Sequence, residues 1–220
     1  METSTTLIAS AYERLRADVI SGHWTPGQKL GIETLRAHYA TGATPVREAL
    51  NRLAAEGWVQ HLEQRGFAVA PVSETALREL AETRCGVESL ALTKAMERHT
   101  PDWEERVVLS LHRLSRTPRS LSTEQYQENP EWEKLHRAFH HTLIEHCGSR
   151  WLVGFCEQLY DQAYRYRQLA VKKVYKQRNE LDEHRAVVDA LIKGDVDTAC
   201  VALTNHYNKT AGIILQSGAH

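Results

Sequence analysis

Residues 44–53 read TPVREALNRL, a segment in which apolar side chains recur at helical spacing. The apolar stripe consists of Val46, Ala49, Leu50, Leu53 and Ala54. Thr44, Arg47 and Asn51 line up on the opposite face. Thr44 suits the N-cap, because its hydroxyl can accept from the free amides of the first turn, and Pro45 suits the first helical position. The segment therefore predicts a well-specified helix with a polar outer face.

The elements on either side of this helix predict a winged helix-turn-helix. The pattern indicates helices over residues 7–20, 32–39 and 44–56, followed by strands over residues 58–62 and 67–70. Gly57 ends the third helix, and the turn Glu63-Gln64-Arg65-Gly66 joins the two strands as a tight hairpin. We therefore predict that residues 1–72 form a DNA-binding domain of this class.

A helix that reads the major groove must present polar side chains on its first turns, as Arg47 and Asn51 do. A glycine beside an arginine at the hairpin tip would allow contact with the DNA backbone or the minor groove. The predicted DNA-contacting residues are Arg36, Thr44, Arg47, Asn51, Arg52, Arg65 and Gly66. The alternative is that Arg47 and Arg52 are ordinary exposed helix residues. The chain carries 27 Lys and Arg against 28 Asp and Glu, which excludes a polybasic binder but not a sequence-specific one.

The rest of the chain, residues 73–220, keeps a helical period and predicts a bundle of about six helices. They are expected over residues 73–98, 102–115, 124–146, 150–174, 179–193 and 195–215. The fold class is therefore mainly α, a winged helix-turn-helix followed by an all-helical domain. The sequence lacks a secretory signal, a membrane span and a cysteine-pair motif. We expect a cytoplasmic protein with reduced thiols and no membrane partner.

Four histidines lie on the apolar stripes of three predicted helices. His136 and His140 stand one turn apart on the first helix, and His184 and His206 lie on the other two. Each imidazole taken alone is explained by burial beside a hydrogen-bond partner. All four together are better explained by one divalent cation, because several buried imidazoles without partners cost desolvation free energy. Imidazole ligands suit zinc, nickel, copper or iron better than magnesium or calcium.

Two charged residues, Arg84 and Glu88, interrupt the apolar stripe of the first helix of this domain. One interpretation is an ion pair at i, i+4 that closes a polar edge of the bundle. The other is that Arg84 holds a carboxylate ligand by a bidentate contact near the metal. The segment Tyr164-Arg165-Tyr166-Arg167 could supply a second cation and a phenol. Periodicity leaves open which arginine faces inward, and we take Arg165 and Tyr166 as the candidates.

Several motifs of the first domain resemble one family. They are Tyr12-Glu13-Arg14-Leu15-Arg16, Pro26-Gly27-Gln28-Lys29-Leu30, residues 44–53, Glu56-Gly57 and Arg65-Gly66-Phe67-Ala68-Val69. In order and spacing they resemble the DNA-binding domain of the GntR family of bacterial transcription regulators. That family usually has Val-Ser-Arg before Thr-Pro, with an arginine that contacts DNA, whereas this chain has Thr41, Gly42 and Ala43. The resemblance implies DNA binding with one base-reading arginine missing.

The second domain resembles the all-helical ligand (FCD) domain of the FadR subfamily. The matching positions are Arg84, Glu88, Phe139-His140, Glu183-His184-Arg185 and His206. The resemblance implies a divalent metal on His140, His184 and His206, with an Asp or Asn expected where this chain has His136. Residues 132–140, 147–149 and 165–167 are most similar to the carbon-starvation-induced regulators. That branch implies repression of dicarboxylate or amino-acid catabolism, with glutarate as the suggested effector.

Together these observations predict a homodimeric repressor that binds a palindromic double-stranded operator and is released by a small carboxylate beside a metal, zinc in the first instance. One alternative is a direct metal sensor, in which the ion itself is the signal. A zinc enzyme acting on small carboxylates is a weaker alternative, because the sequence has no His-Glu-x-x-His and specifies no general base. The last alternative is a helical interaction module that binds no ligand. We predict a regulator and not an enzyme.

Overall fold

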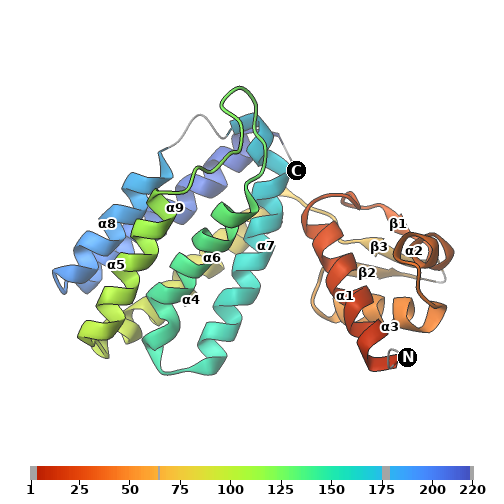
Figure 1. The fold of residues 1–220 in the computed structure, drawn as a ribbon, viewed down its shortest axis with the longest axis horizontal. Helices are drawn as coiled ribbons and strands as arrows, with labels where there is room; N and C mark the ends of the chain where they lie inside the picture. The colour runs from red at the N-terminus through yellow and green to blue at the C-terminus, as the bar shows by residue number, and fades with distance from the viewer. Residues whose placement is uncertain (1–3, 64, 175–178, 219–220) are drawn as a thin grey trace. The chain divides into compact units, whose positions relative to one another are not determined.

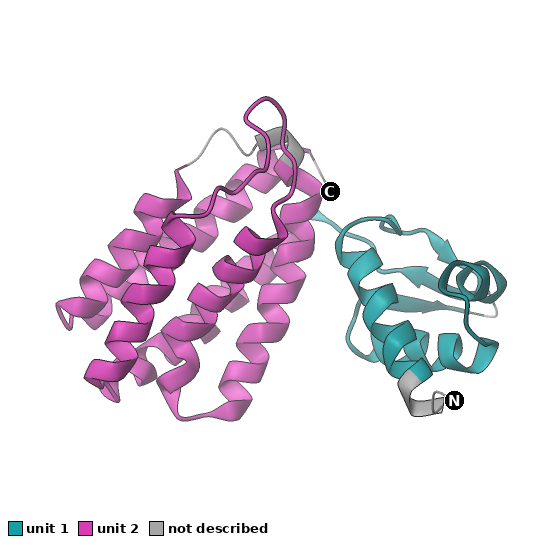
Figure 2. Ribbon diagram, viewed as in Figure 1, with its two compact units in different colours: residues 1–73 teal, residues 74–220 magenta. Residues whose placement is uncertain are grey.

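The computed structural model describes residues 4–63, 65–174 and 179–218. Within these residues the chain forms nine α-helices, one short 3-10 helix and three strands. It divides into two compact units, residues 1–73 and 74–220 (Figure 2). In this part of the chain we find no helix long and apolar enough to cross a membrane.

The first unit is the predicted winged helix-turn-helix (Figure 1). Its elements are α1 (Ser4–Ile20), β1 (Lys29–Leu30), α2 (Ile32–Tyr39), α3 (Ala43–Ala55), β2 (Val59–Leu62) and β3 (Gly66–Val69). The strands form an antiparallel sheet in the order β1-β3-β2, in which Leu62 pairs with Gly66. Leu15, Leu35 and Leu50, one from each helix, are buried. This packing fixes the inner face of α3 and leaves its polar face outward.

The structure corrects the start of α3 and the composition of the sheet. Gly42 is the N-cap residue and Ala43 begins the helix, so Thr44 stands at the second helical position and is not the cap. Pro45 therefore occupies the third position, which still lies in the first turn, where no intrahelical bond needs its missing amide hydrogen. Strand β1 was not predicted, because two residues are too few to show an alternating pattern.

The second unit contains six α-helices among the described residues, as predicted. They are α4 (Glu74–Glu97), α5 (Pro101–Ser115), α6 (Pro130–Ile144), α7 (Arg150–Val174), α8 (Glu180–Ile192) and α9 (Val196–Gln216), with the 3-10 helix Glu145–Cys147 after α6. Trp103, Phe139 and Leu203 from three different helices are completely or almost completely buried in one core. Helix α4 packs against α7 and α9, and α8 packs against α9.

Helix α6 begins at Pro130 and not near residue 124, as the sequence pattern had predicted. The Asn129 side chain accepts a hydrogen bond from the amide of Glu131 and caps the helix, with Pro130 at its start. A proline inside a helix would remove a backbone hydrogen bond and clash with the preceding turn. The residues before it instead form a loop closed by a bridge between Ser120 and Glu128.

Candidate metal centre and nucleic-acid interface

The outer face of α3 is polar and exposed. Thr44, Arg47 and Asn51 are all exposed on it, whereas Leu50 on the opposite face is fully buried. A helix held in this way can enter the major groove with Arg47 and Asn51 directed at base edges. The position where the family resemblance places an arginine is Ala43, the first residue of α3.

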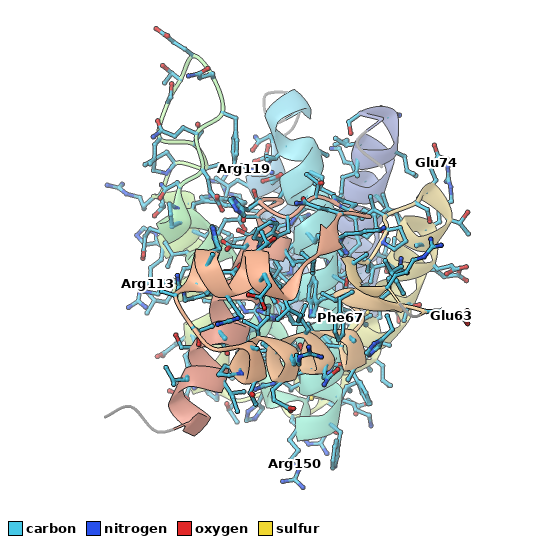
Figure 3. All side chains as sticks on the ribbon, turned by 90° about the vertical axis from the view of Figure 1, so that its right-hand side faces the viewer. Glu63, Phe67, Glu74, Arg113, Arg119 and Arg150 are labelled. Atoms are coloured by element: carbon cyan, nitrogen blue, oxygen red, sulfur yellow. The ribbon has the colours of Figure 1, made fainter. Side chains whose placement is uncertain are left out.

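The tip of the hairpin presents a second exposed arginine. Arg65 and Gly66 are both exposed, while Gln64 of the predicted turn lies outside the described residues. Gly66 has a φ of 89°, in the left-handed region that favours glycine. Behind the tip lies Phe67, which is labelled in Figure 3. Its ring contacts that of His61 on the neighbouring strand, with centroids 4.6 Å apart. The hairpin is therefore a packed element that can carry Arg65 toward a phosphate.

Arg36 and Arg52, the other two predicted DNA contacts, are engaged within the unit. Arg36 Nη1 lies 2.7 Å from a carboxylate oxygen of Glu33. The Arg52 guanidinium lies 3.7 Å from the centre of the Tyr12 ring, and its Nε lies 3.4 Å from Glu56. Contact of either residue with DNA stays a prediction.

The four predicted histidines meet in the second unit. His136 and His140 come from α6, His184 from α8 and His206 from α9. Each is at most 5% exposed. One ring nitrogen from each of the four lies within 4.8 Å of the others, and the Nε2 atoms of His136 and His140 are 3.2 Å apart. The structure therefore brings together the residues that the sequence singled out.

Burial keeps the imidazoles of His136 and His140 neutral. Desolvation, followed by the charge of Arg167, lowers the pKa of His136 well below its ordinary value. Desolvation, followed by the proximity of His184, does the same to the pKa of His140. A neutral imidazole has one nitrogen with a free lone pair, which is the form that binds a metal.

Oxygen atoms contact the Nδ1 side of both the His140 and the His206 ring. Tyr207 donates its hydroxyl hydrogen to Glu88, so its oxygen, 3.2 Å from Nδ1 of His140, accepts the proton of that nitrogen. Nδ1 of His206 lies 2.9 Å from Oε2 of Glu183, which as a carboxylate can only accept. In both rings the Nδ1 proton is held by an oxygen, an arrangement typical of metal-ligating histidines.

His136 differs from these two histidines in which ring nitrogen carries the proton. Its Nδ1 lies 3.2 Å from Nη1 of Arg167, which can only donate, and 2.9 Å from the Tyr160 hydroxyl. The other guanidinium nitrogen of Arg167 lies 3.1 Å from Glu133. Nδ1 of His136 is therefore an acceptor, and the neutral ring carries its proton on Nε2, which faces His140. This geometry makes His136 a hydrogen-bond donor toward the cluster.

Arg84 and Glu88 form the ion pair that the sequence left as one of two interpretations. Both are buried, and Nε of Arg84 lies 2.7 Å from Oε1 of Glu88. The guanidinium stacks 4.0 Å from the centre of the Tyr207 ring. Among the described residues, Nη2 of Arg84 is buried without a hydrogen-bond partner. The pair thus leaves one buried donor of Arg84 open to a further acceptor.

A cavity of about 280 Å³ reaches the histidine cluster at His140. Its wall also includes Glu88 and Tyr160, together with two cationic residues of α6, Lys134 and Arg137. The sequence did not single out these two cations, because they lie off the apolar stripe, on a helix face that ordinarily carries solvated charges. Their position gives the cavity a cationic edge suited to a small anion.

Arg165 and Tyr166, the predicted effector residues, are buried elsewhere on α7. Neither is among the residues that line this cavity. The arginine of α7 that contacts the histidine cluster is Arg167, whose two donor nitrogens reach His136 and Glu133. The effector role of Arg165 and Tyr166 stays a prediction. Tyr160, Glu183 and Tyr207 also contact the histidines, and the one local signal for them in the sequence was Glu183 directly before His184.

Comparison with known proteins matches both units to one class of bacterial regulator. Residues 7–69 match the bacterial regulatory proteins of the gntR family, and residues 79–209 match the FCD domain. The chain belongs to the GntR family and carries a C-terminal FCD domain, which confirms the resemblance. It is a DNA-binding transcriptional regulator.

Two curated relatives and one solved structure agree with this assignment. The HTH-type transcriptional regulator BphR of Paraburkholderia xenovorans is 36% identical over 96% of this chain and 86% of its own length. The HTH-type transcriptional repressor GlaR of Escherichia coli is 32% identical over 94% of this chain and 96% of its own. E. coli McbR/YncC shares the fold, with a TM-score of 0.75 at 21% identity over 98% of this chain and 99% of that one. The relatives are regulators, which confirms the prediction that the chain is not an enzyme.

Proposed function

We propose that the protein is a homodimeric repressor whose C-terminal unit holds a divalent metal and releases a palindromic operator when a small carboxylate binds beside it. The observation that carries this proposal is the meeting of four buried histidines from three helices. GlaR, which is similar along nearly its whole length, is itself named a repressor.

The donor set fits a transition metal of the zinc or nickel type. Nδ1 of His140 and Nδ1 of His206 each lie against an oxygen, so Nε2 of each ring would be the metal ligand, and His184 contributes a third buried imidazole. Three imidazoles with an open position suit such ions. His136 keeps its Nε2 proton and donates a hydrogen bond into the same space. When bound, the ion would supply a Lewis-acidic centre for a carboxylate oxygen.

The cavity at His140 supports a carboxylate as the effector. Lys134 and Arg137 line it, and Arg137 is already paired with Asp161. Glu88 of the buried Arg84–Glu88 pair lines this cavity. Nη2 of Arg84 is available to an acceptor. A second carboxylate or carbonyl on the same molecule would satisfy this guanidinium, which favours short dicarboxylates such as glutarate.

Operator binding measured with and without metal tests this proposal. We expect the metal-loaded protein to bind its operator in fluorescence anisotropy and to be released by a short carboxylate, glutarate included, with a coupling free energy of about 1–3 kcal/mol. The chelated protein should no longer respond to the carboxylate. Operator affinity that changes with metal alone and never with a carboxylate would establish the direct metal sensor instead.

Arg84→Ala is expected to leave operator affinity unchanged and to abolish release by the carboxylate. The variant removes the guanidinium that would bind the anion, while every predicted DNA contact stays in place. Because it also leaves Glu88 buried without its ion-pair partner, a loss of stability of about 3–5 kcal/mol is expected and is measured by denaturant unfolding.

Arg84→Lys serves as the second variant, because it keeps the charge but lacks the planar fork that binds a carboxylate through two hydrogen bonds. The Arg84→Lys variant should fold, and the carboxylate should release it from the operator only weakly. Arg113→Ala, which removes an exposed arginine of α5 (Figure 3), is the matched control and should be released normally. Normal release of both Arg84 variants would place the carboxylate elsewhere.

A further inference from the structure

A second group of metal-ligand side chains lies in the DNA-binding unit. Asp18 stands in the last turn of α1, His23 follows in the next turn, and His38 is near the end of α2. One ligand atom from each lies within 4.8 Å of the other two. Nε2 of His38 is 3.4 Å from Oδ2 of Asp18, and the His23 and His38 rings are 5.0 Å apart and tilted by 31°. From this convergence we propose a second site for a divalent transition metal, formed by Asp18, His23 and His38.

The backbone between α1 and α2 brings these residues together. Gly22 adopts a φ of 79° just after α1, which reverses the chain. The amide of Trp24 then donates to the carbonyl of Asp18 at 3.2 Å, so His23 returns to the end of the helix that it has just left. Trp24 and Tyr39 are buried beneath the group, whereas His23 and His38 are exposed. An ion can therefore reach the site from solvent.

A hydrogen-bonded pair fixes the carboxylate. The Tyr39 hydroxyl donates to Oδ2 of Asp18 at 2.6 Å and accepts from Nε1 of Trp24 at 2.8 Å. Partners of this kind orient a ligand before the metal arrives. Oδ2, which also lies 3.4 Å from Nε2 of His38, has a second lone pair that an ion could use, so the carboxylate needs little reorganisation.

The charge of the surroundings also favours a cation. Asp18 and His38 belong to the last turns of two helices, where the backbone carries partial negative charge. A simple ion pair between protonated His38 and Asp18 would contribute little at such exposure and would leave the position of His23 unexplained. Two imidazoles and one carboxylate form a set that binds zinc, nickel or copper, with water at the remaining positions.

Such an ion would connect α1 to α2, the first helix of the helix-turn-helix. Its binding would stabilise the DNA-binding unit without contributing any group to the histidine cluster of the other unit. The proposal therefore stands or fails independently of the effector site.

Zinc binding to the full chain tests the site. Chelator-treated protein is dialysed to equilibrium against free Zn²⁺ at mildly alkaline pH, where imidazoles are neutral, and bound zinc per chain is measured. We expect His38→Ala to bind one ion fewer than the wild type and His23→Ala to bind that ion at least 10-fold more weakly, by analogy with losses of about 10–100-fold on removal of even outer partners. His61→Ala, which removes an exposed histidine of the same unit on β2, is the matched control.

The same measurement on His140→Ala separates the two sites. That variant should lose the ion of the histidine cluster and keep the one at Asp18, and combining it with His38→Ala should remove both. Equal zinc binding by His38→Ala and His61→Ala would overturn the proposed site. Unchanged zinc binding by His140→Ala would contradict metal binding at the buried histidine cluster but would not affect the proposed site at Asp18.

Discussion

His140→Ala removes the metal from the C-terminal unit and makes operator binding insensitive to the carboxylate; this is the largest effect that we expect. Nδ1 of the His140 ring bonds to the Tyr207 hydroxyl, so Nε2 would be its metal ligand, and alanine offers neither a ligand nor a partner for that hydroxyl. At a free metal concentration 100-fold above the dissociation constant, a bound ion adds about 2.7 kcal/mol to the free energy of unfolding. The variant should lack this metal-dependent increase in the free energy of unfolding. Thermal unfolding with and without metal measures the difference.

His136→Gln is the informative companion variant. Glutamine keeps an N–H donor but no imidazole, so the metal content of the purified protein should stay close to that of the wild type if His136 is a hydrogen-bond donor and not a ligand. A loss of metal equal to that of His140→Ala would make His136 the fourth ligand. Circular dichroism checks that both variants keep their helical content. Full metal retention in His140→Ala would contradict the proposed centre.

Arg47→Ala produces the largest expected loss of operator affinity. Arg47 is exposed on the polar face of α3, and the family's arginine is replaced by Ala43 at the first position of this helix. We therefore expect direct base reading to depend more heavily on Arg47 and Asn51. We expect a loss of about 1–3 kcal/mol if Arg47 contacts a base, or a salt slope lower by about one unit if it contacts a phosphate.

Anisotropy titrations at several salt concentrations distinguish the two contacts. Arg113→Ala removes the same charge from an exposed site in the other unit and should change neither the affinity nor the slope. Operator binding by Arg47→Ala that matches this control at every salt concentration would show that Arg47 is an ordinary exposed helix residue.

The sequence predicted the elements and the histidines because both are local periodic features. Helix α2 has the predicted bounds, and the stripe of α3 is the predicted one. The predicted start of α6 was wrong, because a single residue determines it. Pro130, capped by Asn129, begins the helix, whereas the periodic pattern placed the start near residue 124. Thr44 was mistaken for a cap because Gly42, which lacks a capping side chain, also adopts the extended conformation that an N-cap needs.

The arginine beside the histidines could not be predicted, because α7 has no single inward face. It packs against α4, α6 and α9, so Arg165 is buried and Arg167, two residues further on, is partly buried as well. The roles of the individual imidazoles depend on partners from other helices. Tyr207 sets the proton of His140 and Arg167 sets that of His136, and neither pairing is encoded by local spacing.

Helix α4 provides a continuous connection from the end of the DNA-binding unit to the surroundings of the histidine cluster. It runs unbroken from Glu74, the residue after the first unit, past Glu88. Glu88 accepts a hydrogen bond from the Tyr207 hydroxyl, which in turn contacts Nδ1 of His140, so two hydrogen bonds join Glu88 to His140. Equilibrium linkage has no preferred direction. If a bound anion weakens operator binding as proposed, operator binding must weaken anion binding by the same free energy. We therefore expect operator-bound protein to have a lower affinity for the effector than protein free of DNA.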